Sequence, residues 1–331
     1  MTKVLLEVRG LSKTFPITSG IFRRRKIGEI PAVDGVSLSI NEGETLALVG
    51  ESGCGKSTMG RLFLGLLRPS SGQIFYRGKD ISYVSDKEMR ELRSQFQMIF
   101  QDPFGSLNPR MKVLDLIAEP LKISGVSRVR RQERAMILLQ NVGLSADHAQ
   151  RYPHEFSGGQ RQRIGIARAL ALDPQMIVAD EPVSALDVSV QAQVINLLQD
   201  LQKDLGLTYL FISHDLGVVH HIADRIAVMY LGRIVEIASK RMLSDNPCHP
   251  YTKALLDAIP VSHPGRRRDR EILLGDLPAS REHAFGCRFA TRCRFKTDLC
   301  MKEEPLLLPI GSGHAVACHH VEQIQIGECS S

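Results

Sequence analysis

The sequence contains no tryptophan, and aromatic residues of all kinds make up only 5% of it. Two short basic runs, at residues 23–26 and 266–268, are not interleaved with aromatic rings, so they offer no platform on which nucleic-acid bases could stack. We interpret both runs as solvated charge in a hairpin or a linker. No nucleic acid is therefore expected among the partners.

Long apolar runs are also missing. No stretch approaches the roughly 18 apolar residues that would span a bilayer, and the N-terminus lacks the charged and then apolar regions of a secretory signal. We therefore expect a protein of a reducing compartment. There the seven cysteines are better interpreted as metal ligands or buried thiols than as a disulfide framework.

The composition that is present suits an ordinary folded protein. The 331 residues are enough for two domains, and a hydrophobic fraction of 43% supports a core. The net charge of +6 comes from 42 Lys and Arg against 36 Asp and Glu, and the two signs are interspersed. Such a mild charge permits an anionic ligand or a membrane surface but requires neither.

Residues 1 to about 240 alternate short apolar runs with helical patterns, which predicts a mostly parallel sheet. We expect buried strands at 45–50, 176–180 and 208–213. A helix is expected at 189–205, with an apolar stripe formed by Val190, Val194, Leu197, Leu198, Leu201 and Leu205. Residues 263–270 have the composition of a polar linker, and each motif described below occurs only once.

Residues 50–57 read Gly-Glu-Ser-Gly-Cys-Gly-Lys-Ser. They match the P-loop pattern G-x-x-x-x-G-K-[ST] and directly follow a predicted strand, and we call them the P-loop. The glycines let successive backbone N–H groups point at phosphate oxygens, and the following helix adds its positive end. Lys56 would reach the β and γ phosphates, and the Ser57 hydroxyl would reach Mg²⁺. The residues expected to contact nucleotide are Gly50, Ser52, Gly53, Cys54, Gly55, Lys56, Ser57 and Thr58. Cys54 is expected to fill space in the loop and not to act as a nucleophile.

Two carboxylates, Asp180 and Glu181, end the apolar strand predicted at 176–180. Active groups of open α/β sheets gather at the carboxyl ends of the strands, so both side chains should lie near the phosphate loop. We expect Asp180 to hold Mg²⁺ through water. Glu181 would polarise the water that attacks the γ phosphate.

Residues 157–160 (Ser-Gly-Gly-Gln), between Phe156 and Arg161, resemble the signature of ABC ATPases. Other landmarks of that family follow the same chain order: a Q-loop glutamine at Gln101, a D-loop at 184–187 and a switch histidine at His214. Phe15 stands where the family places an aromatic ring under adenine. The resemblance implies an α/β fold of the P-loop NTPase class, with a RecA-like core and with antiparallel β and α-helical subdomains.

The resemblance also implies how the site works. In ABC ATPases the signature of one subunit closes over the γ phosphate held by the P-loop of another, so Ser157, Gly158, Gly159 and Gln160 should contact ATP in trans. His214 would bridge the γ phosphate, Glu181 and the opposing D-loop. Gln101 would join Ser57 as a ligand of Mg²⁺.

Residues 102–110, 179–189 and 246–252 narrow the resemblance to the ATP-binding subunits of dipeptide and oligopeptide importers, closest to the second ATPase of the dipeptide importers. This implies an ATP-hydrolysing motor at the cytoplasmic face of the inner membrane. Its partners would be a second, homologous ATPase and two transmembrane permease subunits, with an extracytoplasmic peptide-binding protein acting indirectly. The loop 101–110 would receive a permease coupling helix.

Other readings stay open at this stage. The same motor could serve nickel, a haem precursor, glutathione or an opine. A DNA-associated ABC ATPase is a more distant alternative, because only about 100 residues without sustained heptads separate the P-loop from the signature.

Cys287, Cys293, Cys300 and Cys318 fall within 32 residues, separated by five, six and seventeen residues. The spacing contains no C-x-x-C pair and matches neither common zinc ribbons nor the compact ferredoxin run. Four thiols in a reducing compartment still indicate a metal, although unlinked thiols remain an alternative. The resemblance to peptide-importer ATPases implies a [4Fe–4S] cluster rather than zinc. We therefore expect an ATPase domain at 1–245 and a Cys-rich extension at 246–331, with Cys329 outside the ligand set.

Overall fold

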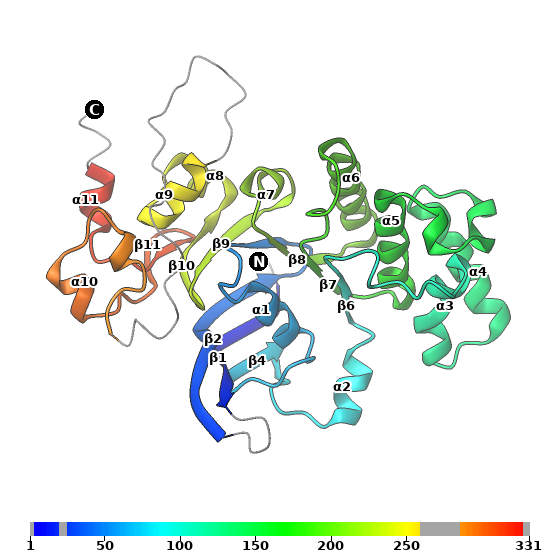
Figure 1. Ribbon diagram of the computed structural model, residues 1–331, viewed down its shortest axis with the longest axis horizontal. Coiled ribbons are helices and arrows are strands. Elements are labelled where there is room, and N and C mark those ends of the chain that lie inside the picture. The colour runs from blue at the N-terminus through cyan, green and yellow to red at the C-terminus, as the bar shows by residue number, and fades with distance from the viewer. Residues whose placement is uncertain (1–2, 20–24, 259–284, 327–331) are drawn as a thin grey trace, which may run out of the picture.

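The computed structural model describes residues 3–19, 25–258 and 285–326 (Figure 1). The basic run 266–268, the linker 263–270 and Cys329 lie outside the described residues, as do residues 23 and 24 of the other basic run. Among the described helices, none combines the length and the apolar character that a membrane span requires.

An eight-stranded sheet forms the centre of the molecule. Its strands are β3 (Thr45–Val49), β6 (Phe96–Ile99), β7 (Met176–Asp180), β8 (Thr208–Ser213), β9 (Arg225–Tyr230), β10 (Arg233–Ser239), β11 (Leu308–Gly311) and β12 (His314–Val316). They lie in the order β11-β12-β10-β9-β3-β8-β7-β6, and the strands from β9 to β6 are parallel. The three strands predicted from apolar runs are confirmed, and all are buried because helices or a second sheet cover both faces.

A second, antiparallel sheet covers one face of the first. It consists of β1 (Val4–Ser19), β2 (Arg25–Asn41), β4 (Ser71–Tyr76) and β5 (Lys79–Asp80), in the order β2-β1-β4-β5. Helix α1 (Lys56–Phe63) lies between the two sheets (Figure 1). Its Met59 and Leu62 are fully buried against Leu46 and Leu48 of β3, so the core fixes the start of α1 over the end of that strand.

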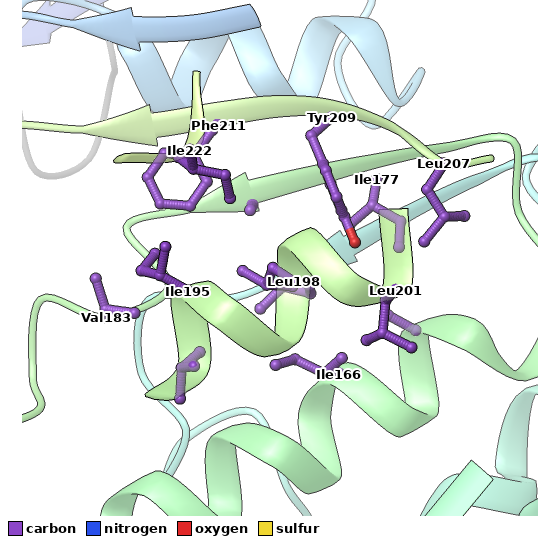
Figure 2. Close-up of a cluster of buried hydrophobic side chains, with 14 of the residues drawn as sticks. Ile166, Ile177, Val183, Ile195, Leu198, Leu201, Leu207, Tyr209, Phe211 and Ile222 are labelled. Atoms are coloured by element: carbon purple, nitrogen blue, oxygen red, sulfur yellow. The ribbon is translucent and has the colours of Figure 1, made fainter. Parts of the chain in front are cut away.

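Helices α6 (Val188–Leu205) and α7 (Leu216–Ile222) cover the opposite face of the central sheet (Figure 1). Figure 2 shows Ile195, Leu198 and Leu201 of α6 packed toward Tyr209 and Phe211 of β8. The predicted stripe is confirmed at its centre, with Val194, Leu198 and Leu201 buried. Its end is wrong, because Leu205 occupies the last position of the helix and is 48% exposed. The next residue, Gly206 at φ 64°, turns the chain toward β8.

A helical lobe extends from the β6 edge of the sheet (Figure 1). It contains α3 (Val113–Ile123), α4 (Arg128–Asn141), α5 (Gly158–Ala169) and the short 3₁₀ turns at Ala146–Gln150, Pro153–Glu155 and Leu170–Leu172. Helix α3 packs against both α4 and α5. Helix α2 (Asp86–Leu92) connects the antiparallel sheet to β6. These parts correspond to the expected core, antiparallel β and α-helical subdomains.

The C-terminal segment joins the central sheet. It follows α8 (Lys240–Asp245) and α9 (Pro250–Asp257), and contains a 3₁₀ turn (Ala290–Arg292), α10 (Asp298–Lys302) and α11 (Val321–Ile326). Strand β12 pairs with β10, at Glu236 opposite Val316. The segment therefore shares backbone hydrogen bonds with the nucleotide-binding part, and the sheet crosses the boundary expected at residue 245.

Candidate functional site

The loop at residues 50–55 joins β3 to α1 and requires glycine at both of its ends. Gly55 has a φ of 111°, and a Cβ atom there would lie 2.0 Å from the backbone oxygen of Ala32. A Cβ atom on Gly50 would lie 2.1 Å from the backbone oxygen of Met229. The loop is thus pressed against neighbouring backbone, and it presents the N-terminus of α1 toward the cavity described below.

Lys56 is held inside this loop. Its Nζ donates hydrogen bonds to the backbone oxygens of Gly50 (2.7 Å) and Glu51 (2.9 Å), and the residue is only 5% exposed. The ammonium group is therefore fixed over the centre of the loop, where a phosphate group would approach.

Ser57 and Asp180 connect α1 to the end of β7. The Ser57 hydroxyl donates to Asp180 Oδ1 at 2.9 Å. Burial raises the pKa of Asp180, and the hydrogen bond from Ser57 opposes that rise. A hydroxyl and a buried carboxylate at this spacing are hard oxygen donors of the type that Mg²⁺ prefers.

Glu181, the next residue, has a backbone φ of 47° although it is not glycine. Its N–H donates to Ile212 O at 2.9 Å, and its carbonyl oxygen accepts from the Ser184 hydroxyl at 3.1 Å. These bonds from β8 and the following turn hold a conformation that costs about 1–3 kcal/mol. The strain aims the carboxylate at the cavity, where Gln101 Nε2 donates to Oε2 (2.9 Å) and His214 Nδ1 lies 3.2 Å from Oε1.

These side chains surround a cavity of about 680 Å³. The predicted residues that line it are Gly50, Ser52, Gly53, Gly55, Lys56, Ser57, Thr58, Gln101, Glu181 and His214. The sequence did not single out three further lining residues, Ala32, Glu51 and Leu255. Ala32 and Leu255 lie far along the chain from the loop, so no local motif could have indicated them.

Besides the signature residues, three residues predicted to bind nucleotide do not line the cavity. Cys54 is 2% exposed, and burial raises its thiol pKa, as suits a residue that fills space. Asp180 accepts the hydrogen bond from Ser57 but lines a neighbouring, larger cleft. Phe15 lies on β1, 37% exposed, with Lys13 Nζ 5.6 Å from its ring centroid.

The signature residues 157–160 lie at the start of α5 in the helical lobe, and none of them lines this cavity. Ser157 caps the helix: its hydroxyl accepts from Gln160 N–H, and the Gln160 side chain accepts from Ser157 N–H. A Cβ atom on Gly159 would lie 2.3 Å from Val190 of α6, so close helix packing requires glycine there. The structure thus brings together the P-loop, Gln101, Glu181 and His214, but not the signature.

A larger cleft, about 1270 Å³, opens on the other side of Gln101. Residues of the loop 100–106 and of α3 line it, including Phe100, Glu119 and Ile123. Arg168 closes it by donating to Ser106 O at 2.6 Å. The cleft joins the expected permease-docking loop to the nucleotide cavity, because Gln101 borders both.

The four predicted metal-binding cysteines lie close together in the C-terminal segment. Burial raises the pKa of Cys287 to about 12 and that of Cys318 to about 11, and the charges of neighbouring cysteines add to both rises. The sulfurs of Cys287, Cys293 and Cys318 each accept the backbone N–H of the residue two positions later. Cys300 is buried, and its backbone oxygen accepts Cys287 N–H at 2.7 Å.

Comparison with known proteins agrees with this geometry. A family model described as "ABC transporter" matches residues 33–184, and one described as "Oligopeptide/dipeptide transporter, C-terminal region" matches residues 235–300. The oligopeptide transport ATP-binding protein AppF of Bacillus subtilis is 53% identical over 96% of this chain and 97% of its own length. The dipeptide transport ATP-binding protein DppF of Escherichia coli is 50% identical over 96% of this chain and 95% of its own length.

Solved structures show the same cassette. A dimeric ATP-binding cassette, MJ0796, in a post-hydrolysis state with ADP and phosphate, is 29% identical. It covers 72% of this chain and 99% of its own length, with a TM-score of 0.64. The solved cassette covers 72% of this chain and gives no support for the cysteine-rich segment, and the names of the two relatives above mention no iron–sulfur cluster.

Proposed function

This chain belongs to the ATP-binding proteins of oligopeptide and dipeptide ABC transporters, and from that premise we propose that it drives the import of short peptides. It is an ATPase, as the proteins of this family are. The relatives named above match nearly the whole chain and carry peptide or dipeptide transport in their names, which favours peptides over nickel, haem precursors, glutathione or opines.

The arrangement of Glu181 is the observation that carries the proposed reaction. Both of its oxygens are engaged, one by Gln101 and one by His214, at the mouth of the P-loop cavity. A water there forms a bond to the γ phosphorus while the bond from that phosphorus to the β–γ bridging oxygen breaks. ADP keeps the bridging oxygen with its electron pair, and the water proton passes to the Glu181 carboxylate.

Lys56 and the N–H groups of the P-loop bind the phosphates in this reaction. Ser57 and Gln101 would ligate Mg²⁺ directly, and Asp180 would do so through water. The hydrogen bond between Ser57 and Asp180 supports that set, because it brings two hard oxygen donors together beside the cavity. Mg²⁺ supplies charge that offsets the charge of the β and γ phosphates.

We further propose that the working unit is a heterodimer of this chain and a second, homologous ATPase subunit. The signature residues 157–160 are absent from the lining of this chain's cavity, so a second subunit has to supply its own signature there. The dimer formed by the MJ0796 cassette supports this arrangement. The second subunit would be a homologous ATPase, and a coupling helix of one of the two permease subunits would dock at loop 101–110, beside the cleft.

The four cysteines are proposed to hold a [4Fe–4S] cluster. The support is chemical: four thiols lie in one segment, and a backbone N–H donated to three of the sulfurs lowers the pKa of each against the larger rise that burial causes.

Peptide uptake by cells that lack this chain tests the cargo. We expect the wild-type chain to restore uptake of a labelled dipeptide, and Glu181→Gln to fail while still assembling with its partners. Restored uptake of nickel or glutathione without peptide uptake would replace the cargo assignment.

Metal analysis of protein purified without oxygen tests the cluster. We expect a brown protein with about four irons per chain, as a [4Fe–4S] cluster requires, and loss of that iron in Cys287→Ser. One zinc per chain, or no metal, would remove the cluster and leave the ATPase assignment intact.

A further inference from the structure

The segment between Cys287 and Cys293 touches the P-loop directly. Arg292, the residue before Cys293, places Nη1 3.0 Å from Oε2 of Glu51. The side chain of Arg292 is 8% exposed and that of Glu51 is 22% exposed, so this ion pair is largely shielded from water. Glu51 is a P-loop residue and lines the nucleotide cavity.

A second contact from the same segment supports the P-loop backbone. Phe289 is buried against the rings of Tyr230 and Tyr251, with centroids 5.3 and 5.5 Å away. The hydroxyl of Tyr251 accepts the backbone N–H of Glu51 at 2.9 Å. Phe289 therefore packs against the ring of Tyr251, whose hydroxyl holds the backbone N–H of Glu51.

A third contact reaches the middle of the loop. Arg288 donates to the backbone oxygen of Leu231, and the next residue, Gly232, donates its N–H to Cys54 O at 2.8 Å. Three of the five side chains between the two cysteines thus support the P-loop: Arg292 at the Glu51 carboxylate, Phe289 behind the group that holds the Glu51 N–H, and Arg288 near Cys54. Their positions depend on where Cys287 and Cys293 are held.

The charge of Glu51 makes the first of these contacts important for function. A carboxylate in a loop that binds a triphosphate repels the ligand, and burial strengthens that repulsion because the local dielectric is low. The Arg292 guanidinium pairs with this carboxylate and offsets its charge beside the cavity. Without Arg292, the P-loop would carry an unpaired negative charge at its entrance.

We propose that Arg292 is a positioning residue for nucleotide binding, and that the group held by the cysteines controls the affinity for ATP by ordering residues 287–293. The inference rests on the proposed nucleotide site and adds a regulatory input to it. Loss of the group loosens Cys287 and Cys293, releases the Arg292–Glu51 pair and weakens ATP binding. The chain would then couple its transport activity to the integrity of its cysteine group.

Affinity measurements on the full-length protein test the ion pair. We would titrate wild type, Arg292→Ala, Glu51→Gln and the double variant with a non-hydrolysable ATP analogue by calorimetry. Arg292→Ala should weaken binding about tenfold, which corresponds to about 1.4 kcal/mol. The double variant should return to within about threefold of wild type, because removing the carboxylate removes the repulsion.

The outcomes separate this inference from the nucleotide site itself. If wild type binds the analogue and Arg292→Ala binds it equally well, the inference fails and the site stands. If wild type does not bind, the nucleotide site fails. If the double variant binds the analogue as weakly as Arg292→Ala does, Arg292 acts only through folding, and its positioning role is overturned. Arg294→Ala is the matched control, because its guanidinium stacks on Phe295, 4.5 Å from the ring centroid.

The role of the cysteine group is tested by the same titration on Cys293→Ser and on protein stripped of its metal. Both should bind the analogue about as weakly as Arg292→Ala, and adding Arg292→Ala to Cys293→Ser should weaken binding no further. Hydrogen exchange at residues 50–55 should speed up in each case. If the affinity for the analogue and the exchange rate stay unchanged after the metal is lost, the cysteine group does not control ATP binding. The same conclusion follows if the wild-type protein contains no metal.

Discussion

The imidazole Nδ1 of His214 lies 3.2 Å from Oε1 of Glu181. These two residues come from different strands, since Glu181 follows β7 and His214 follows β8. Because adjacent parallel strands end at the same edge of a sheet, the pairing of β7 with β8 brings both side chains to the cavity. Gln101, which follows β6 on the other side of β7, completes the set through its hydrogen bond to Oε2.

Glu181→Gln should abolish most hydrolysis while ATP still binds. The amide keeps the shape of the side chain but accepts no proton, and a positioned general base contributes typically about 10²- to 10⁴-fold. Phosphate release should therefore fall by at least about 100-fold, with the affinity for ATP within a few-fold of wild type. Phosphate release at the wild-type rate would remove the base assignment.

Lys56→Ala should act on binding itself. The Lys56 ammonium is buried in the P-loop and offers its charge to the phosphates, so its loss should weaken ATP affinity by at least about tenfold. Calorimetric titration with ATP and Mg²⁺ checks this. Lys79→Ala is the control, because Lys79 is on the distant strand β5, where its Nζ lies 3.8 Å from Glu88. Equal affinity in the two variants would contradict the P-loop interpretation.

Ser157→Ala should impair hydrolysis without changing nucleotide binding at this chain's own P-loop. Ser157 caps α5 in the helical lobe and is absent from the cavity lining, so its effect has to appear at the site of a partner subunit. The experiment compares ATP affinity of the isolated chain with ATPase activity of the assembled pair. Weakened binding in the isolated chain would argue against an arrangement in trans.

The sequence was sufficient where the chemistry is local. The P-loop could be predicted because its glycines, Lys56 and Ser57 are consecutive and follow an apolar strand. Asp180 and Glu181 could be placed because they end another such strand. What the sequence did not reveal is the strained backbone of Glu181, since glutamate has no preference for a positive φ and only the bonds to β8 and Ser184 impose it.

Contacts between distant parts of the chain could also not be predicted from the sequence. Glu51 and Arg292 are 241 positions apart, and no sequence motif contains both of them. Strand β11 was missed because all four of its residues are exposed, so it has no alternating pattern. Leu205 is the opposite case, because it fits the apolar period of the predicted helix and is nevertheless exposed. The period alone does not show which part of the helix the sheet buries.

A buried carboxylate should tie the C-terminal segment to the rest of the protein. Glu236 on β10 is fully buried and accepts from the backbone N–H groups of Cys248 (2.8 Å) and His249 (2.9 Å), and His314 Nε2 on β12 lies 2.8 Å away. A buried group that loses its hydrogen-bond partner costs about 1–3 kcal/mol. His314→Ala should therefore lower the melting temperature clearly, and His221→Ala, at an exposed position, should not.

His249 should make the protein less stable in acid. Burial lowers its pKa to about 4 from an ordinary 6.5, although the nearby Glu236 favours the charged form. Below pH 6.5 the unfolded chain binds a proton at this histidine that the folded chain does not bind, so stability is complete above about pH 6.5 and falls as the pH drops toward 4. At 1.36 kcal/mol per pKa unit, the loss is on the order of 3 kcal/mol.

His249→Asn isolates that contribution. The Nδ1 atom of His249 accepts the backbone N–H of Tyr251 at the start of α9, and an asparagine oxygen can do the same. The variant should therefore keep the fold at neutral pH and unfold in urea with a midpoint that changes less between pH 7 and pH 5 than that of wild type. His221→Gln, at an exposed position on α7, should keep the full wild-type pH dependence. If His249→Asn lost stability in acid as steeply as wild type, the dependence would have to come from other groups.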